Sequence, residues 1–92
     1  MLKVYRFTAA WCGPCQTMKP TVEKLIEKYN TPDSGVEIVS IDVELEENKD
    51  IAVEYGVRSI PTLVFEKNGE TIERLTGAKT FEAIDALIEV HI

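Results

Sequence analysis

The only two cysteines of the chain stand three positions apart, in the run Trp11-Cys12-Gly13-Pro14-Cys15. This run lies where an apolar, strand-like segment gives way to a segment with helical periodicity. One helical turn separates the two thiols, so each can attack or release the other. The spacing therefore predicts thiol-disulfide exchange chemistry at the N-terminus of a helix.

Cys12 is expected to cap that helix. A capping sulfur accepts hydrogen bonds from N–H groups of the first turn and lies at the positive end of the helix dipole, and both effects favour a thiolate. We therefore expect Cys12 to be the exposed, attacking sulfur and Cys15, facing inward, to be the resolving sulfur. Pro14 suits a first turn because the N–H that it lacks would have no helical partner there.

Two other uses of the cysteine pair fit the sequence less well. A bridge that closes so short a loop removes little chain entropy and cannot link distant segments, which disfavours a purely stabilising disulfide. A zinc site needs four ligands, whereas the chain offers one cysteine pair and a single histidine, His91, near its end. We therefore expect no metal site.

Size and charge limit the classes of function. Ninety-two residues, of which 45% are hydrophobic, are enough for a single domain over residues 1–92. Sixteen acidic and ten basic residues give a net charge of −6, which argues against nucleic acid or an anionic membrane as a partner. No apolar run approaches a membrane-spanning length, and the first residues are too strand-like for a secretory signal. We expect a monomer in the cytoplasm, where a lone vicinal cysteine pair is typical of redox activity.

Hydrophobic periodicity predicts the element order βαβαββα. Strands are expected at Leu2–Phe7, Val36–Val43, Thr62–Phe65 and Thr71–Thr76, and helices from the Cys12 cap to Tyr29, around Ile51–Tyr55, and after a Thr80 cap. A helix between the first two strands favours parallel pairing, and Asn68-Gly69 predicts a hairpin between the last two. The pattern is typical of an α/β fold with a four-stranded mixed sheet flanked by three helices.

Further landmarks follow the cysteine motif along nearly the whole chain. They are Pro20, the run Tyr55-Gly56-Val57-Arg58-Ser59-Ile60-Pro61-Thr62, the run Lys67-Asn68-Gly69-Glu70, and Gly77 ahead of the last helix. With these landmarks in this order, the sequence resembles the thioredoxin family. The resemblance implies the thioredoxin fold, a redox-active Cys12–Cys15 disulfide, and a cis Pro61 that lies against it.

The resemblance also implies a protein-disulfide reductase. Such an enzyme carries no bound cofactor and receives electrons from NADPH through a separate flavin-dependent thioredoxin reductase. Its apolar surface for docking disulfide-containing protein substrates would consist of Trp11, Gly13, Pro14, Ile60, Pro61, Gly77 and Ala78. The Ile60 backbone would pair with an extended substrate segment, which makes little demand on substrate sequence. Packing of Trp11 in the core is the competing interpretation.

The sequence departs from the family pattern in two places. Family members usually begin with an extra strand and helix, so one sheet face should be less covered here. Arg6 stands where typical thioredoxins have a buried aspartate, the usual internal proton acceptor, and Thr8 stands where they have a tryptophan. We expect Arg6 to be a partly exposed strand residue. The alternative is burial under the active-site helix, which would require a carboxylate such as Asp42 or Glu44.

Two other functions stay open at this point. In glutaredoxins, too, the first strand leads directly into the cysteine motif, so this sequence also fits a glutathione-dependent, glutaredoxin-like oxidoreductase. Such enzymes, however, usually have Pro-Tyr between the cysteines and a Gly-Gly-x-x-Asp stretch where this chain has Gly77-Ala78-Lys79-Thr80-Phe81. A binding module of a larger assembly would use the same fold as a clamp, with redox chemistry incidental. The thioredoxin-type reductase is the interpretation that we favour.

Overall fold

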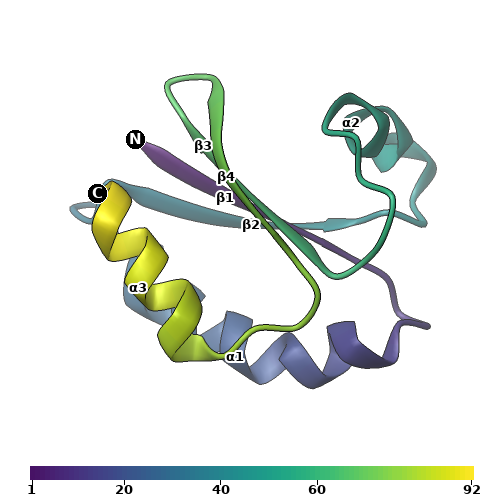
Figure 1. Ribbon diagram of the computed structural model, residues 1–92, viewed down its shortest axis with the longest axis horizontal. Helices are drawn as coiled ribbons and strands as arrows, with labels where there is room; N and C mark the ends of the chain where they lie inside the picture. The colour runs from purple at the N-terminus through teal and green to yellow at the C-terminus, as the bar shows by residue number, and fades with distance from the viewer.

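The computed structural model describes residues 1–92 as one mixed sheet with helices on both faces (Figure 1). The strands are β1 (Leu2–Thr8), β2 (Val36–Asp42), β3 (Thr62–Lys67) and β4 (Glu70–Thr76). The helices are α1 (Gly13–Tyr29), α2 (Lys49–Glu54) and α3 (Phe81–His91), with a 3-10 turn, η1 (Glu46–Asn48), ahead of α2. The predicted fold class and element order are confirmed.

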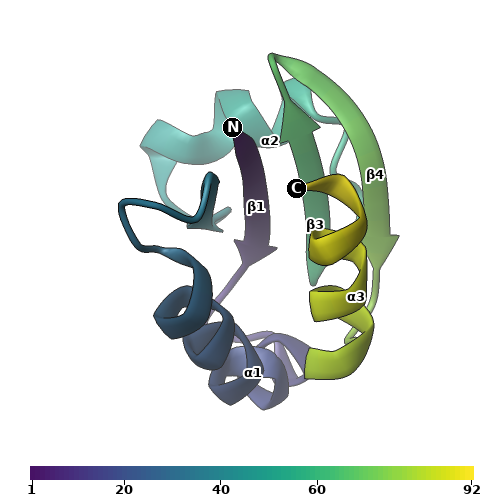
Figure 2. The same cartoon turned by 90° about the vertical axis from the view of Figure 1, so that its left-hand side faces the viewer.

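The strand order β2-β1-β3-β4 puts β1 and β3 in the middle of the sheet. Figure 2 shows β1, β3 and β4 in this order. The pair β1 and β2 is parallel, because α1 provides the crossover that a parallel pair needs. The other two pairs are antiparallel. The turn between β3 and β4 has positive φ at Asn68 (55°) and Gly69 (82°), as a two-residue hairpin of this kind requires.

The main core lies between the sheet and the pair α1 and α3. Its twelve buried residues are Leu2, Val4, Met18, Val22, Leu25, Tyr29, Val36, Ile38, Leu63, Phe65, Ile84 and Ile88. The opposite face, under α2, has a cluster of three buried residues, Phe7, Ile41 and Val64. Because α2 itself buries no residue, this face is the less covered one, as the sequence suggested.

Helix ends follow the sequence signals. Thr80 caps α3, where its Oγ1 accepts a hydrogen bond from the N–H of Ala83 at 3.2 Å. Helix α1 continues through Pro20, although that residue cannot donate a helical hydrogen bond.

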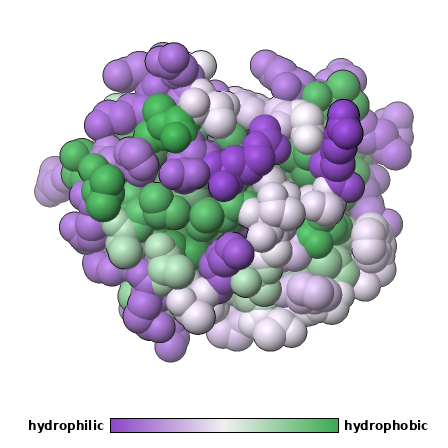
Figure 3. Space-filling view, in the orientation of Figure 1, coloured by the Kyte–Doolittle hydropathy of each residue, from purple (hydrophilic) through white to green (hydrophobic).

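None of the helices combines the length and the apolar character needed to cross a membrane. On the face shown in Figure 3, hydrophilic residues line the rim and hydrophobic ones gather mainly in the left half.

Strand ends differ from the prediction where tertiary pairing decides them. Strand β3 continues beyond Phe65 to Lys67, because Glu66 and Lys67 pair with Lys3 and Leu2 of β1. The acidic stretch before α2, predicted to be a loop, contains the turn η1. Neither difference moves the element that carries the cysteines.

Candidate active site

Cys12 and Cys15 form a disulfide at the N-terminus of α1, with their Cα atoms 5.2 Å apart. Cys12 is the N-cap residue and has an extended backbone (φ −85°, ψ 109°). Its Sγ accepts a hydrogen bond from the backbone N–H of Cys15 at 3.2 Å. No acidic residue occupies the first turn, so no side chain neutralises the positive end of the helix dipole beside this sulfur.

The two cysteines differ little in exposure. Cys15 has no exposed surface, and Cys12 keeps only 5% of its own. Cys12 is therefore less exposed than expected, because it packs against Ala9 and the partly buried Val43 and Ile60. Its Sγ lies 3.8 Å from the carbonyl oxygen of Ile60. An oxidised sulfur has no proton to donate, so this approach is a contact that only the reduced thiol can turn into a hydrogen bond.

The segments expected to form the docking surface lie at the same end of the sheet as the disulfide. The Ile60–Pro61 peptide bond is cis, and Pro61 is buried. The carbonyl oxygen of Pro61 accepts a hydrogen bond from the N–H of Gly77 at 2.9 Å, which holds the end of β4 beside the start of β3. Gly13, Pro14 and Ala78 are exposed. The structure thus places the N-terminus of α1, the Ile60-Pro61 segment and the Gly77-Ala78 segment at one end of the sheet.

Trp11 stands at the rim of this region with 68% of its surface exposed. The competing interpretation, in which Trp11 packs in the core, is therefore wrong. The residue lies in the loop that joins β1 to the Cys12 cap, outside both layers of the core.

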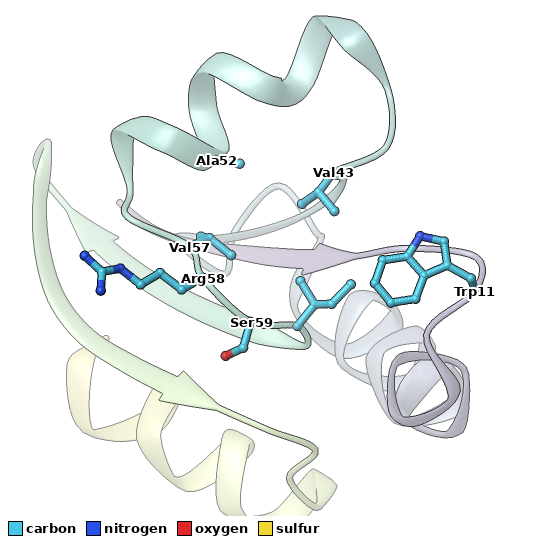
Figure 4. Close-up of a pocket in the computed structure, with 7 residues that line it drawn as sticks. Trp11, Val43, Ala52, Val57, Arg58 and Ser59 are labelled. Atoms are coloured by element: carbon cyan, nitrogen blue, oxygen red, sulfur yellow. The ribbon is translucent and has the colours of Figure 1, made fainter.

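A pocket of about 370 Å³ lies between Trp11 and α2 (Figure 4). It is lined by Trp11, Val43, Ala52, Val57, Arg58, Ser59 and Ile60. In Figure 4 the Trp11 ring stands at one end, while the Arg58 side chain points away from the other. Of this set, the sequence predicted only Trp11 and Ile60 as docking residues. The others are supplied by α2 and by the connections before and after it, whose placement no local pattern reveals.

Arg6 is buried, with 7% of its surface exposed, so the expectation of a partly exposed strand residue is wrong. Alternation along β1 puts it on the same face as Leu2 and Val4, and α1 covers that face. Its Nη2 donates a hydrogen bond to the carbonyl oxygen of Cys15 at 2.9 Å.

The expected carboxylate partner of Arg6 is also wrong. None of the ion pairs in the structure includes Arg6, and a carboxylate oxygen of Asp42 instead accepts a hydrogen bond from the backbone N–H of Glu44. The Nε of Arg6 has no hydrogen-bond partner. Burial lowers the pKa of the Arg6 guanidinium, and the charge of Glu23 opposes that shift.

Fold and site together define a dithiol thiol-disulfide oxidoreductase. A cysteine pair separated by one helical turn bridges at the N-terminus of a helix, and its surroundings are apolar. No group of three or more His, Cys, Asp or Glu side chains is placed to hold a metal ion. The chemistry that this arrangement supports is the exchange of one disulfide for another.

Comparison with known proteins agrees with that class. Residues 2–90 match the family model named Thioredoxin. The thioredoxin of Bacillus subtilis is 42% identical over 86 residues, which cover 94% of this chain and 78% of the relative. For the thioredoxin of Porphyra purpurea the identity is 37%, over 94% of this chain and 76% of the relative. The X-ray structure of Fasciola hepatica thioredoxin gives a TM-score of 0.84 at 35% identity, covering 99% of this chain and 81% of that one.

The chain belongs to the thioredoxin family. Members of the family are protein-disulfide oxidoreductases that act on disulfide substrates, work with a reductase partner and carry no bound cofactor. These matches do not favour the glutathione-dependent alternative.

Proposed function

We propose that the protein reduces disulfide bonds in other proteins by a relay in which Cys12 attacks and Cys15 resolves. The observation that carries this assignment is the cap geometry of Cys12, whose sulfur already accepts the N–H of Cys15. A thiolate at that point would accept the same hydrogen bond and face the positive end of the α1 dipole. Cys15 has no exposed surface with which to meet a substrate first.

The relay has two exchange steps. In the first, the Cys12 thiolate attacks one sulfur of a substrate disulfide, and the other substrate sulfur leaves with the electron pair. In the second, the Cys15 thiolate attacks the Sγ of Cys12, and the remaining substrate sulfur leaves as a thiolate. The substrate gains two electrons and, from water, two protons. The protein is left with the Cys12–Cys15 disulfide.

Substrate docking is proposed at Trp11, Gly13, Pro14, Ile60, Pro61, Gly77 and Ala78. Neither the N–H nor the carbonyl oxygen of Ile60 takes part in a backbone hydrogen bond, so both can pair with an extended substrate segment. The exposed Trp11 ring and the apolar pocket next to it supply area for side chains of that segment. Recognition through the backbone suits an enzyme that accepts many sequences.

The electron source is proposed to be NADPH, delivered by a separate flavin-dependent thioredoxin reductase, as the family membership suggests. The oxidised protein needs such a partner because each turnover leaves it with a disulfide. We further propose that the protein works as a monomer in the cytoplasm, without nucleic acid or membrane partners. A reducing compartment keeps the dithiol ready, and the net charge of −6 disfavours polyanions.

Insulin reduction tests this function, with electrons supplied in one reaction by NADPH and thioredoxin reductase and in another by glutathione. We expect activity with the reductase system. The Cys12→Ser variant should lose it, and Cys15→Ser should accumulate a mixed disulfide with the substrate. Ala10→Ser, at an exposed position ahead of the motif, is the matched control for a new serine.

Three outcomes would contradict the proposal. Activity with glutathione alone would assign the electron supply to the other system. Alkylation at neutral pH that labels Cys15 before Cys12 would reverse the roles of the sulfurs. Binding of a partner that survives the double Cys12→Ser, Cys15→Ser variant, without any reductase activity in the wild type, would point to a clamp.

A further inference from the structure

Arg6 is the only charged residue among the buried residues of the chain, and it lacks an ionic partner. Buried charges are normally paired, because removal from water is costly. Here the guanidinium instead binds the carbonyl oxygen of Cys15. That carbonyl belongs to the first turn of α1.

The bond to the carbonyl puts a positive charge close to the sulfur of the same residue. The carbonyl oxygen and Sγ of one cysteine lie within about 5 Å of each other by covalent geometry. With the 2.9 Å hydrogen bond added, the guanidinium nitrogen is no farther than about 8 Å from the Cys15 Sγ. Cys15 has no exposed surface, so little water screens the interaction.

Other charged groups around this position are better solvated. From α1, Lys19 and Glu23 are both exposed, and from the end of β2, Asp42 is half-buried. Lys19 and Asp42 share with Arg6 a recess of about 250 Å³. Across β1, the neighbours of Arg6 are the uncharged Ser40 and Leu63. Water therefore screens the interaction between Arg6 and Cys15 less than it screens the interactions of Cys15 with these other charged groups.

We propose that Arg6 is a positioning residue that stabilises the thiolate of Cys15 for the resolving step. The inference rests on the proposed relay and deepens it. The Cys15 thiol gives its proton to water, and the thiolate attacks the Cys12 Sγ of the mixed disulfide. The Cys12–substrate bond breaks, and the substrate sulfur leaves with the electron pair. A neighbouring positive charge favours the ionised thiol, so the step requires no buried carboxylate as proton acceptor.

The same charge favours the reduced protein over the disulfide. An ionised thiol is stabilised only in the dithiol form, because the disulfide carries no charge for Arg6 to attract. Loss of Arg6 should therefore make the reduction potential more negative at pH 7. A purely structural role of Arg6 would not move the potential in a charge-dependent way.

The test uses the Cys12→Ser protein, in which Cys15 is the only cysteine. With ¹³Cβ-labelled cysteine, the NMR signal of Cys15 reports its ionisation directly as pH is raised. Three second substitutions separate the contributions. Arg6→Met removes charge and donor, Arg6→Gln removes the charge but keeps a donor, and Arg6→Lys keeps the charge. Arg74→Met is the matched control, because Arg74 is exposed on β4 and its guanidinium also binds a backbone carbonyl, that of Tyr55.

We expect the titration midpoint of Cys15 to rise by about one pH unit in Arg6→Met and Arg6→Gln, and by less in Arg6→Lys. Arg74→Met should leave it unchanged. An unchanged or lowered midpoint in Arg6→Gln overturns the proposal, and so does an equal rise in Arg6→Lys and Arg6→Gln. If Arg6→Met does not fold, Arg6→Gln and Arg6→Lys give the decision.

Failure of this proposal is separable from failure of the relay. The Cys15 midpoint is measured without substrate or reductase, so it does not depend on which disulfides the enzyme reduces. If insulin reduction persists in Cys12→Ser, the relay is wrong whatever the midpoint does. If the relay works but the titration midpoint of Cys15 is the same with and without Arg6, only the proposed role of Arg6 is refuted.

Discussion

The Sγ of Cys12 has both a structural role and a proposed chemical role. Its Sγ caps α1 by accepting the N–H of Cys15, and the same sulfur is the proposed nucleophile. The usual capping residues are Ser, Thr, Asp and Asn, whose oxygens accept this hydrogen bond well. The reactive position is therefore one at which a serine keeps the structural role while losing the redox role.

The stability of Cys12 variants follows from this overlap. Compared under reducing conditions, Cys12→Ser should leave the free energy of unfolding within about 0.5 kcal/mol of the wild type, because serine caps as well. Cys12→Ala should lose about 1 kcal/mol, since the N–H of Cys15 then has no capping acceptor. Urea denaturation with a thiol reductant measures both. Equal losses in the two variants would show that the cap contributes nothing.

Arg6 gives a second prediction for a single residue. Its guanidinium is buried, takes part in no ion pair, and donates a hydrogen bond to the carbonyl oxygen of Cys15. Methionine fills similar space without the desolvation cost, so Arg6→Met should raise the free energy of unfolding by about 1 kcal/mol. Urea denaturation of the reduced protein at pH 7 provides the measurement, with Arg74→Met as control. A loss of stability in Arg6→Met would mean that the guanidinium holds α1 on β1.

Sequence patterns predicted the cysteine pair at the start of a helix but not the surroundings of Arg6. Alternation along β1 shows which face a residue shares with Leu2 and Val4. It does not show how far along that face a helix extends. Burial of Arg6, and its choice of the Cys15 carbonyl over Asp42, depend on where α1 crosses β1.

At the scale of elements, α1 and α3 are joined by a polar cluster next to the core. The Tyr29 hydroxyl lies between Asp85, to which it makes a short hydrogen bond, and Glu89 at 2.9 Å. Lys28 Nζ donates to Asp85 at 2.8 Å. These donors lower the pKa of Asp85, with Lys28 the larger cause. Burial, and then the hydrogen bond with Asp85, raise the pKa of Tyr29 above its usual range.

This cluster should make stability depend on pH at the acid end. The pKa of Asp85 is lower in the folded chain than in the unfolded one. Its stabilising effect is therefore complete above the unfolded value of about 4 and is lost as pH falls through the folded pKa. Asp85→Asn should cost about 1 kcal/mol at pH 7, and the difference from the wild type should shrink below about pH 4.

Thermal unfolding of both proteins from neutral pH to about pH 3 tests this prediction. Asp33→Asn is the control, because Asp33 is exposed and forms no ion pair. A difference between wild type and Asp85→Asn that stays constant across the range would rule out ionisation of Asp85 as the source of the effect.

Elements with strong local signals were predicted well, and their ends less well. The helical spacing from Met18 predicts α1 by itself, and Asn68-Gly69 predicts the hairpin by itself. Each of these elements is decided by residues that are neighbours in the chain. The extension of β3 to Lys67 depends on pairing with Leu2 of β1, and the pocket beside Trp11 depends on where α2 settles. Both are decided between segments far apart in sequence.

At the scale of the whole molecule, the two faces of the sheet carry unequal layers (Figure 1). The face under α1 and α3 holds the large core cluster, and the face under α2 holds a small one. Neither α2 nor η1 contributes a buried residue. Only partly buried side chains of α2, those of Ile51 and Ala52, pack against the small cluster, which lowers the cost of opening this region locally.

Native-state hydrogen exchange should reveal this asymmetry. Amides of α2 should exchange through local opening, at a free energy well below that of global unfolding. Amides in the middle of β1 and β3 should exchange only on global unfolding, because these strands have neighbours on both sides. Measurement by NMR over a series of low denaturant concentrations distinguishes the two kinds of exchange. Protection of α2 equal to that of β1 would contradict the prediction.

Trp11 gives the molecule a built-in optical signal. It is the only tryptophan of the chain, it is largely exposed to water, and it directly precedes Cys12, the proposed nucleophile. A protein that covers the ring removes that water and shifts the indole emission to shorter wavelength. Stopped-flow fluorescence can therefore time the arrival and departure of each unlabelled target without a dye or a coupled reaction.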